Sequence, residues 1–125
     1  VIDDEANFLD TLLKRLKKRG IDACGFLNGE EAIPFMRQNP QDVILLDMKI
    51  PGGIDGLAIF REIKNILPRA CVIFLTGHAT LESSNEGIQM GAADYLVKPV
   101  NIDDLLRKIA AATGRGDAPG SGICS

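Results

Sequence analysis

The sequence is poor in the features that mark secreted, membrane-spanning or nucleic-acid-binding chains. It has only three cysteines in 125 residues, Cys24, Cys71 and Cys124, and they lack the spacing of a metal site or a CxxC motif. No apolar run approaches the roughly 18 residues of a membrane span, and no secretory signal is visible at the start. The 14 basic and 17 acidic residues leave a net charge of −3, so no overall field attracts DNA or an anionic membrane. We therefore expect a cytoplasmic protein with reduced thiols that binds neither DNA nor a membrane directly.

The composition is that of a globular domain. Hydrophobic residues make up 46% and charged residues 25% of the chain, a balance typical of soluble folded proteins, and the length suits one domain. We expect this domain to span residues 1–113, with a flexible tail or linker over 114–125, where glycine, proline and serine dominate. Val1-Ile2 reads as the end of an apolar strand, which predicts a truncated first strand and a longer native protein.

Helical and strand-like segments alternate along the chain. Leucines at helical spacing predict a first helix that Gly20 ends, and Asn28 with Glu31 three residues later predicts a capped second helix, which Pro34 should shorten or kink. Further helices are predicted around 57–67, weakly over 80–90, and after a cap at Asn101. Short apolar runs predict the strands, which are Val1-Ile2, Ile21 to Phe26, Val43 to Leu46, Cys71 to Leu75 and Tyr95 to Val97.

This alternation predicts an α/β fold. Continuous apolar strands such as Val43 to Leu46 are typical of a parallel sheet that helices cover on both faces. We expect a doubly wound five-stranded parallel sheet in the flavodoxin-like order 2-1-3-4-5, in which ligands bind outside the carboxyl ends of the strands.

Polar side chains follow four of the predicted strands. Asp3, Asp4 and Glu5 follow the first, Asp47 the third, Thr76 the fourth and Lys98 the fifth. Each alone has a plain structural explanation, such as a helix-dipole partner or a turn residue, but together they would share one edge of the sheet. Crowded carboxylates require a cation, and Mg²⁺ prefers such oxygen ligands. With a hydroxyl and an ammonium added, the pattern indicates phosphoryl transfer with Asp47 as the nucleophile.

In these residues the chain resembles the response-regulator receiver domains of two-component signalling. The matching segments cover essentially the whole predicted domain, and they are Val1-Ile2-Asp3-Asp4-Glu5, Val43 to Gly52, Asp55-Gly56-Leu57, Phe74 to Ala79 and Gly91 to Pro99. The loop from Pro51 to Gly56 is one residue longer than the commonest form in the family.

The resemblance implies a set of site residues. Asp47 would accept a phosphoryl group from a sensor histidine kinase or a histidine phosphotransfer protein. Asp3 and Asp4 would hold Mg²⁺ together with Asp47 and the backbone carbonyl of Lys49. Thr76 and Lys98 would stabilise the phosphoryl group.

It also implies switching and tuning residues. Tyr95 would be the aromatic switch, the Lys98-Pro99 peptide would be cis, and Lys49 and His78 would tune dephosphorylation. Phosphorylation would change the face made by the fourth helix, fifth strand and fifth helix, which would act on an output domain or partner, for example by dimerisation or in transcription. Apart from its own phosphorylation and slow autodephosphorylation, no enzymatic activity is implied.

Three other functions are weighed against this one. A dehalogenase-type phosphatase needs a second aspartate two residues after the nucleophile, where this chain has Lys49. An FMN carrier needs a hydroxyl-rich loop after the first strand, where Asp3-Asp4-Glu5 would repel phosphate. A degenerate receiver that serves only as a protein-binding module should have lost an acid or the lysine, and this chain has lost neither.

Overall fold

A computed structural model describes residues 1–47, 56–76 and 91–113 of the chain. Three parallel strands form its sheet in the order β1-β2-β3: β1 spans Val43–Asp47, β2 spans Cys71–Thr76 and β3 spans Asp94–Val97. β2 lies between the other two, with Val43 opposite Cys71 and Ile73 opposite Asp94. These strands form at the three later apolar runs that the sequence predicts.

The first two predicted strands are reduced to single bridges among the described residues. Ile2 pairs in parallel with Phe26 on one side and with Leu46 on the other. Residues 21–25 form no ladder, so the strand predicted from Ile21 to Phe26 is wrong as an element. Among the described residues this segment pairs only with Val1 to Asp3, through three backbone hydrogen bonds, and so short a stretch does not make a ladder. The spatial order of the five segments is nevertheless the predicted 2-1-3-4-5.

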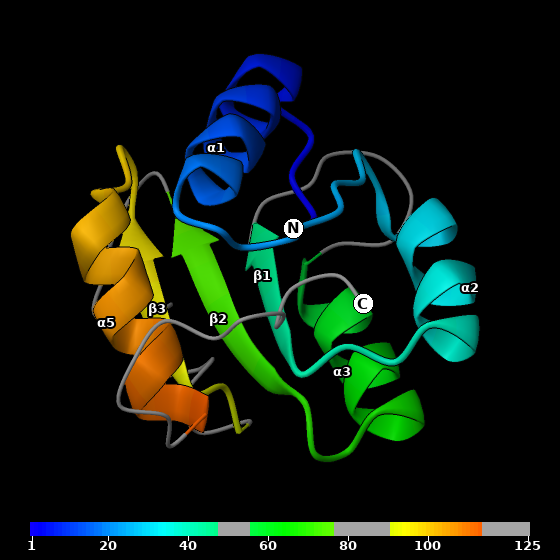
Figure 1. The fold of residues 1–125 in the computed structure, drawn as a ribbon. Coiled ribbons are helices and arrows are strands. Elements are labelled where there is room, and N and C mark those ends of the chain that lie inside the picture. The colour runs from blue at the N-terminus through cyan, green and yellow to red at the C-terminus, as the bar shows by residue number, and fades with distance from the viewer. Residues whose placement is uncertain (48–55, 77–90, 114–125) are drawn as a thin grey trace.

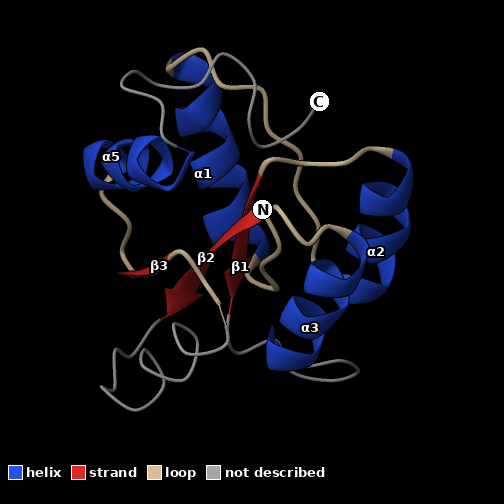
Figure 2. Ribbon diagram, turned by 90° about the horizontal axis from the view of Figure 1, so that it is seen from below, coloured by secondary structure: helices blue, strands red, loops and turns tan. Residues whose placement is uncertain are grey.

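In the described part of the chain, four helices cover the sheet. Helix α1 spans Ala6–Lys18, α2 spans Gly29–Gln38, α3 spans Gly56–Ile66 and α5 spans Ile102–Thr113. α1 and α5 lie on one face, and α2 and α3 lie on the other (Figures 1 and 2). The predicted weak helix at 80–90, the loop 51–55 and the tail 114–125 lie outside the described residues.

The helix ends follow the sequence signals. The Asn28 side chain accepts a hydrogen bond from the Glu31 N–H at 2.9 Å, and Asn101 Oδ1 accepts from the N–H groups of Asp103 and Asp104. Gly20 has φ of 79°, the left-handed conformation that ends many helices. α2 runs through Pro34 over all ten of its residues, so the proline does not shorten the helix as predicted.

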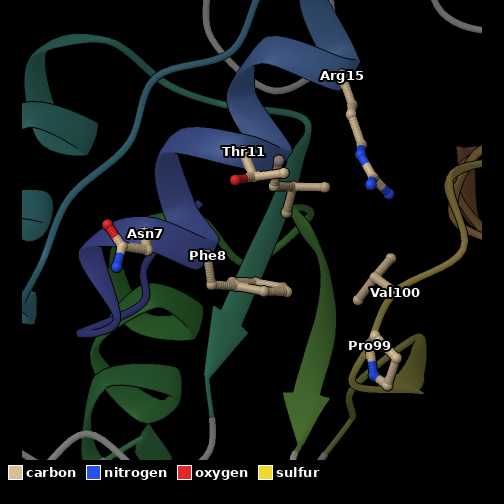
Figure 3. Close-up of a pocket in the computed structure, with 7 residues that line it drawn as sticks. Asn7, Phe8, Thr11, Arg15, Pro99 and Val100 are labelled. Atoms are coloured by element: carbon tan, nitrogen blue, oxygen red, sulfur yellow. The ribbon is translucent and has the colours of Figure 1, made fainter.

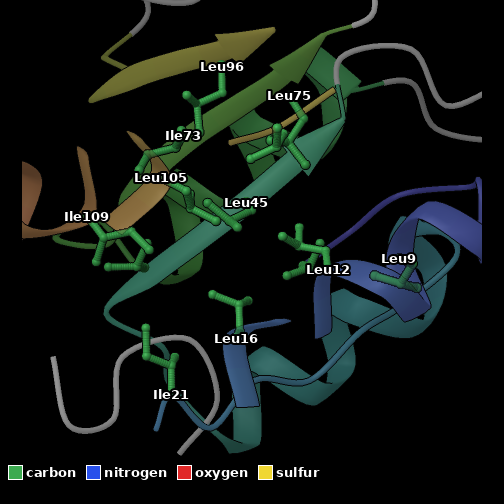
Figure 4. Close-up of a cluster of buried hydrophobic side chains, with 13 residues drawn as sticks. Leu9, Leu12, Leu16, Ile21, Leu45, Ile73, Leu75, Leu96, Leu105 and Ile109 are labelled. Carbon is green, nitrogen blue, oxygen red and sulfur yellow. The ribbon is translucent and has the colours of Figure 1, made fainter. Parts of the chain in front are cut away.

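Two apolar clusters hold the helices to the sheet. Alternate residues along each strand point to opposite faces, so Leu45 packs toward α1 and α5 while Ile44 and Leu46 pack toward α2 and α3. Figure 4 shows the first cluster, which includes Leu9, Leu12, Leu16, Ile73, Leu75, Leu105 and Ile109. Both faces of the central strands are thus buried, as a doubly wound sheet requires.

The cysteines differ from one another. Cys71 is a free thiol whose Sγ lies 3.2 Å from the carbonyl oxygen of Ala112 in α5. Cys24 is disulfide-bonded in the structure, so the prediction of a reduced thiol at this position is wrong.

Candidate functional site: an acidic pocket at the strand ends

The carboxylates of Asp3, Asp4 and Asp47 meet at the carboxyl ends of the parallel strands. One oxygen of each lies within 4.8 Å of an oxygen of the other two. Asp47 is the last residue of β1, and Asp3 follows the bridge residue Ile2, whose N–H donates to the Leu45 carbonyl beside it. Parallel pairing of the two segments therefore brings together residues far apart in the sequence.

Two of these carboxylates are buried. Asp3 has no exposed surface and Asp47 is 4% exposed. The Glu5 N–H donates to Asp3 Oδ1 at 2.9 Å, while Asp3 Oδ2 makes no well-aligned hydrogen bond with the described residues. Buried carboxylates are costly to keep charged without a cation, so this cluster requires one.

Lys98 supplies that positive charge. Its Nζ lies 2.7 Å from Asp3 Oδ2, 3.1 Å from Glu5 Oε1 and 3.3 Å from Asp47 Oδ2. The Phe8 ring lies on another side of the ammonium, with its centroid 4.4 Å from Nζ, a cation–π distance. Burial alone would lower the pKa of Lys98, but the surrounding carboxylates outweigh it and raise that pKa above its ordinary value. Lys98 is therefore charged at neutral pH.

The end of β2 completes this edge of the sheet. Thr76 is the last residue of β2 and is 4% exposed. The backbone N–H of Lys98 donates to the Thr76 carbonyl oxygen at 2.8 Å, which fixes the base of the lysine beside the threonine. The Lys98-Pro99 peptide bond is cis, the isomer expected there.

Tyr95 is the second residue of β3, and its half-buried side chain packs against the second apolar cluster, on the opposite face of the sheet from Leu96. The Nζ of Lys108 is 6.0 Å from the Tyr95 ring centroid and 2.9 Å from Asp94 Oδ2. The described residues thus contain every predicted site residue except Lys49 and His78, which lie outside them.

The sequence named Glu5 as part of the acidic segment but did not predict its ion pair with Lys98, and it did not predict the contact of Phe8 with Lys98.

A groove of about 270 Å³ adjoins this pocket. Its walls come from α1 and from the chain that follows β3, as Figure 3 shows, and they are Asn7, Phe8, Thr11, Leu12, Arg15, Pro99 and Val100. Phe8 belongs both to the groove and to the surroundings of Lys98. The groove therefore lies directly beside the acidic pocket.

The residues present fit a divalent cation. Three carboxylates offer hard oxygen ligands within a few ångströms of one another, and a buried oxygen of Asp3 has no well-aligned hydrogen-bond donor among the described residues. Mg²⁺ and Ca²⁺ prefer such ligands. Fold and site together define a class: parallel α/β domains with an acidic pocket at the strand ends that could hold a divalent cation.

Comparison with known proteins identifies the family within that class. The family model described as the response regulator receiver domain matches residues 1–110. The chain therefore belongs to the receiver domains of response regulators, whose members act as signalling phosphoacceptors.

The relatives agree with this assignment. The DNA-binding transcriptional regulator NtrC of Salmonella typhimurium is 35% identical over 112 residues, which is 90% of this chain and 24% of the relative. The chain thus spans about a quarter of the length of that relative. Among solved structures, a receiver domain from Clostridium thermocellum is 36% identical with a TM-score of 0.83, covering 90% of both chains.

A second solved structure is that of a phosphorylated relative. It is a response regulator protein from Burkholderia pseudomallei with a phosphorylated aspartic acid, a calcium ion and citrate. Its sequence is 27% identical, its TM-score is 0.81, and the match covers 90% of this chain and 66% of that one.

No helix among the described residues of this chain is long and apolar enough to cross a membrane.

Proposed function

We propose that Asp47 is the phosphoacceptor of this receiver domain. The observation that supports this most directly is its position: a buried carboxylate that ends β1 and contacts both an acidic cluster and a lysine ammonium. In the reaction an Asp47 oxygen attacks phosphorus, the bond to the histidine nitrogen of the donor breaks, and an acyl phosphate forms. The donor would be a sensor histidine kinase or a histidine phosphotransfer protein.

The acidic cluster would hold Mg²⁺. Asp3, Asp4 and Asp47 supply carboxylate oxygens, and the family resemblance adds the backbone carbonyl of Lys49. When bound, the ion neutralises negative charge at the phosphoryl group. Asp3 and Asp4 would serve as ligands, and Asp47 would keep one oxygen for the attack.

Lys98 and Thr76 would stabilise the transferred group. Lys98 Nζ is already 3.3 Å from Asp47 Oδ2, so its charge can pair with a phosphoryl oxygen there. The Thr76 hydroxyl, at the neighbouring strand end, would donate to a second phosphoryl oxygen. Lys49 and His78 would tune how fast water removes the group, and with it the slow autodephosphorylation.

The phosphodonor would dock in the groove beside α1. That groove adjoins Lys98 through Phe8, and Arg15 lies at its wall. A donor seated there can bring a phosphohistidine to the acidic pocket without crossing another part of the domain.

Phosphorylation would change the face that includes β3 and α5. The movement of Thr76 toward the phosphoryl group would let Tyr95 turn inward, as in receivers that use an aromatic switch. We propose that this face then controls an output domain or a second copy of the domain in the cytoplasm. Regulation of transcription is the output that the relationship to NtrC favours. The alternative is a receiver that acts only as a protein-binding module.

Mass spectrometry of the intact protein separates these two functions. The chain is incubated with acetyl phosphate and Mg²⁺, beside Asp47→Asn and a sample without metal. One added phosphoryl group in the first sample alone supports the proposal. If the first sample also gains no phosphoryl group, the binding-module alternative holds.

A further inference from the structure

Lys98 has one carboxylate partner that stands outside the acidic cluster. Its ammonium pairs with Asp3, Asp47 and Glu5 at 2.7, 3.3 and 3.1 Å. Asp3 and Asp47 belong to the cluster that could hold a cation, whereas Glu5 does not belong to any such cluster among the described residues. Two partners of Lys98 are therefore proposed metal ligands, and the third is not.

The position of Glu5 in the fold is not explained by the helix that follows it. Glu5 is the N-cap residue of α1, where serine, threonine, aspartate and asparagine are preferred because their short side chains accept a backbone hydrogen bond. The Glu5 side chain makes no such bond. Its carboxylate instead reaches Lys98, and its N–H donates to Asp3 Oδ1, which holds it beside the pocket.

We propose that Glu5 is a positioning residue that retains Lys98 when a divalent cation takes over Asp3 and Asp47. The inference rests on the proposed metal site. An ammonium and a divalent cation repel each other and compete for the same carboxylate oxygens, so Lys98 must give up part of its contact with Asp3 and Asp47. Among the described residues, Glu5 and the Phe8 ring are the contacts that it can keep.

This exchange of partners has two consequences. Glu5 makes metal binding easier, because the displaced ammonium finds another anion within 3.1 Å. It also keeps Lys98 close to Asp47, ready to pair with a phosphoryl group when one arrives. Its 63% exposed side chain is a weaker partner than a dianionic phosphoryl group in the pocket, so the lysine is released again on phosphorylation.

A double-mutant cycle on Mg²⁺ affinity tests the proposal. Calorimetry compares the unsubstituted chain, Glu5→Gln, Lys98→Met and the double variant. With Lys98 present, Glu5→Gln should raise the Mg²⁺ Kd about threefold to tenfold; in the Lys98→Met background it should raise it less than about twofold, because only the direct attraction between Glu5 and the ion is then lost.

A second readout does not depend on Lys98→Met being folded. The NMR signal of the Lys98 ammonium, assigned by its loss in Lys98→Arg, should stay protected from solvent exchange after Mg²⁺ is added to the unsubstituted chain. In Glu5→Gln it should lose that protection once Mg²⁺ binds. Asp10→Asn is the matched control, since it removes the same charge from α1 at an exposed residue that pairs with Lys14, and it should leave both readouts unchanged within about twofold.

The failures can be told apart. Equal effects of Glu5→Gln with and without Lys98, or an ammonium signal that responds to Mg²⁺ identically in Glu5→Gln and the unsubstituted chain, would overturn the role of Glu5 while leaving the metal site intact. Absence of Mg²⁺ binding to the unsubstituted chain would overturn the metal site and this inference with it.

Discussion

Two groups of ion pairs in this domain have nearly the same distances and different surroundings. Lys98 pairs with its carboxylates at 2.7 to 3.3 Å, and Arg37 in α2 pairs with Glu62 in α3 at 3.0 Å. The side chains of Lys98 and Asp3 are 12% and 0% exposed, against 58% and 40% for Arg37 and Glu62. Water screens the Arg37–Glu62 pair much more than the Lys98–Asp3 pair, so similar distances correspond to different interaction energies.

The comparison also shows what each group is for. A buried ionic cluster is a poor way to stabilise a fold, because apolar residues of the same volume stabilise it equally well. Its persistence at the strand ends therefore points to function. The Arg37–Glu62 pair bridges two helices that already pack through the second apolar cluster, which includes Ile33 and Phe60.

The largest expected effect follows from removing the buried cation. Lys98→Met should lower the free energy of unfolding by about 3–5 kcal/mol at neutral pH without divalent metal, since it leaves two buried carboxylates without the cation paired with them. Chemical denaturation monitored by circular dichroism measures this. A loss below about 1 kcal/mol would place the cluster in the same class as the surface pair.

The stability difference between the unsubstituted chain and Lys98→Met should depend on pH. Because the folded-state pKa of Lys98 lies above its unfolded value, its contribution to stability is fully present below the unfolded pKa of about 10.4. It is lost as pH rises from there through the folded-state pKa. The difference in unfolding free energy between the unsubstituted chain and Lys98→Met should thus stay constant from about pH 7 to 10 and shrink above that. A difference that shrinks already near pH 8 would contradict the raised pKa.

Divalent metal should partly replace the missing lysine. In Lys98→Met, Mg²⁺ at a hundred times its Kd should restore about 2.7 kcal/mol of unfolding free energy, because it binds the folded state and not the unfolded one. The measurement is denaturation with and without Mg²⁺, with Asp3→Asn/Lys98→Met as the control that loses a metal ligand. Equal Mg²⁺ stabilisation of both variants would argue against Asp3 as a ligand.

The smallest effect is expected at the surface pair. Arg37→Gln or Glu62→Gln should change the unfolding free energy by about 0.2–1 kcal/mol, and 1 M salt should remove most of that change. The change in unfolding free energy of the double variant should equal the sum of the changes in the two single variants to within about 1 kcal/mol. A cost of several kcal/mol would mean that this exposed pair behaves like the buried cluster.

Local sequence signals predicted most of the fold because they act over a few residues. The apolar runs ending at Asp47, Thr76 and Val97 form strands, and Asn28 and Asn101 cap helices as predicted. The strand expected from Ile21 to Phe26 failed because a strand needs a partner of sufficient length. Pro34 did not shorten α2, whose buried Ala32, Ile33 and Met36 pack against the second cluster.

The candidate site also has features that the sequence determined and features that only the tertiary structure decided. The sequence by itself determined the residue types at the strand ends and, through the parallel order, that Asp3, Asp4, Asp47, Thr76 and Lys98 share one edge. Only the tertiary structure decided which atoms meet: that the Lys98 ammonium pairs with Glu5 as well as with the buried acids, and that the Phe8 ring lies against it. The physical reason is that residue types fix which charges are present, whereas the path of α1 past the end of β3 fixes the distances between them.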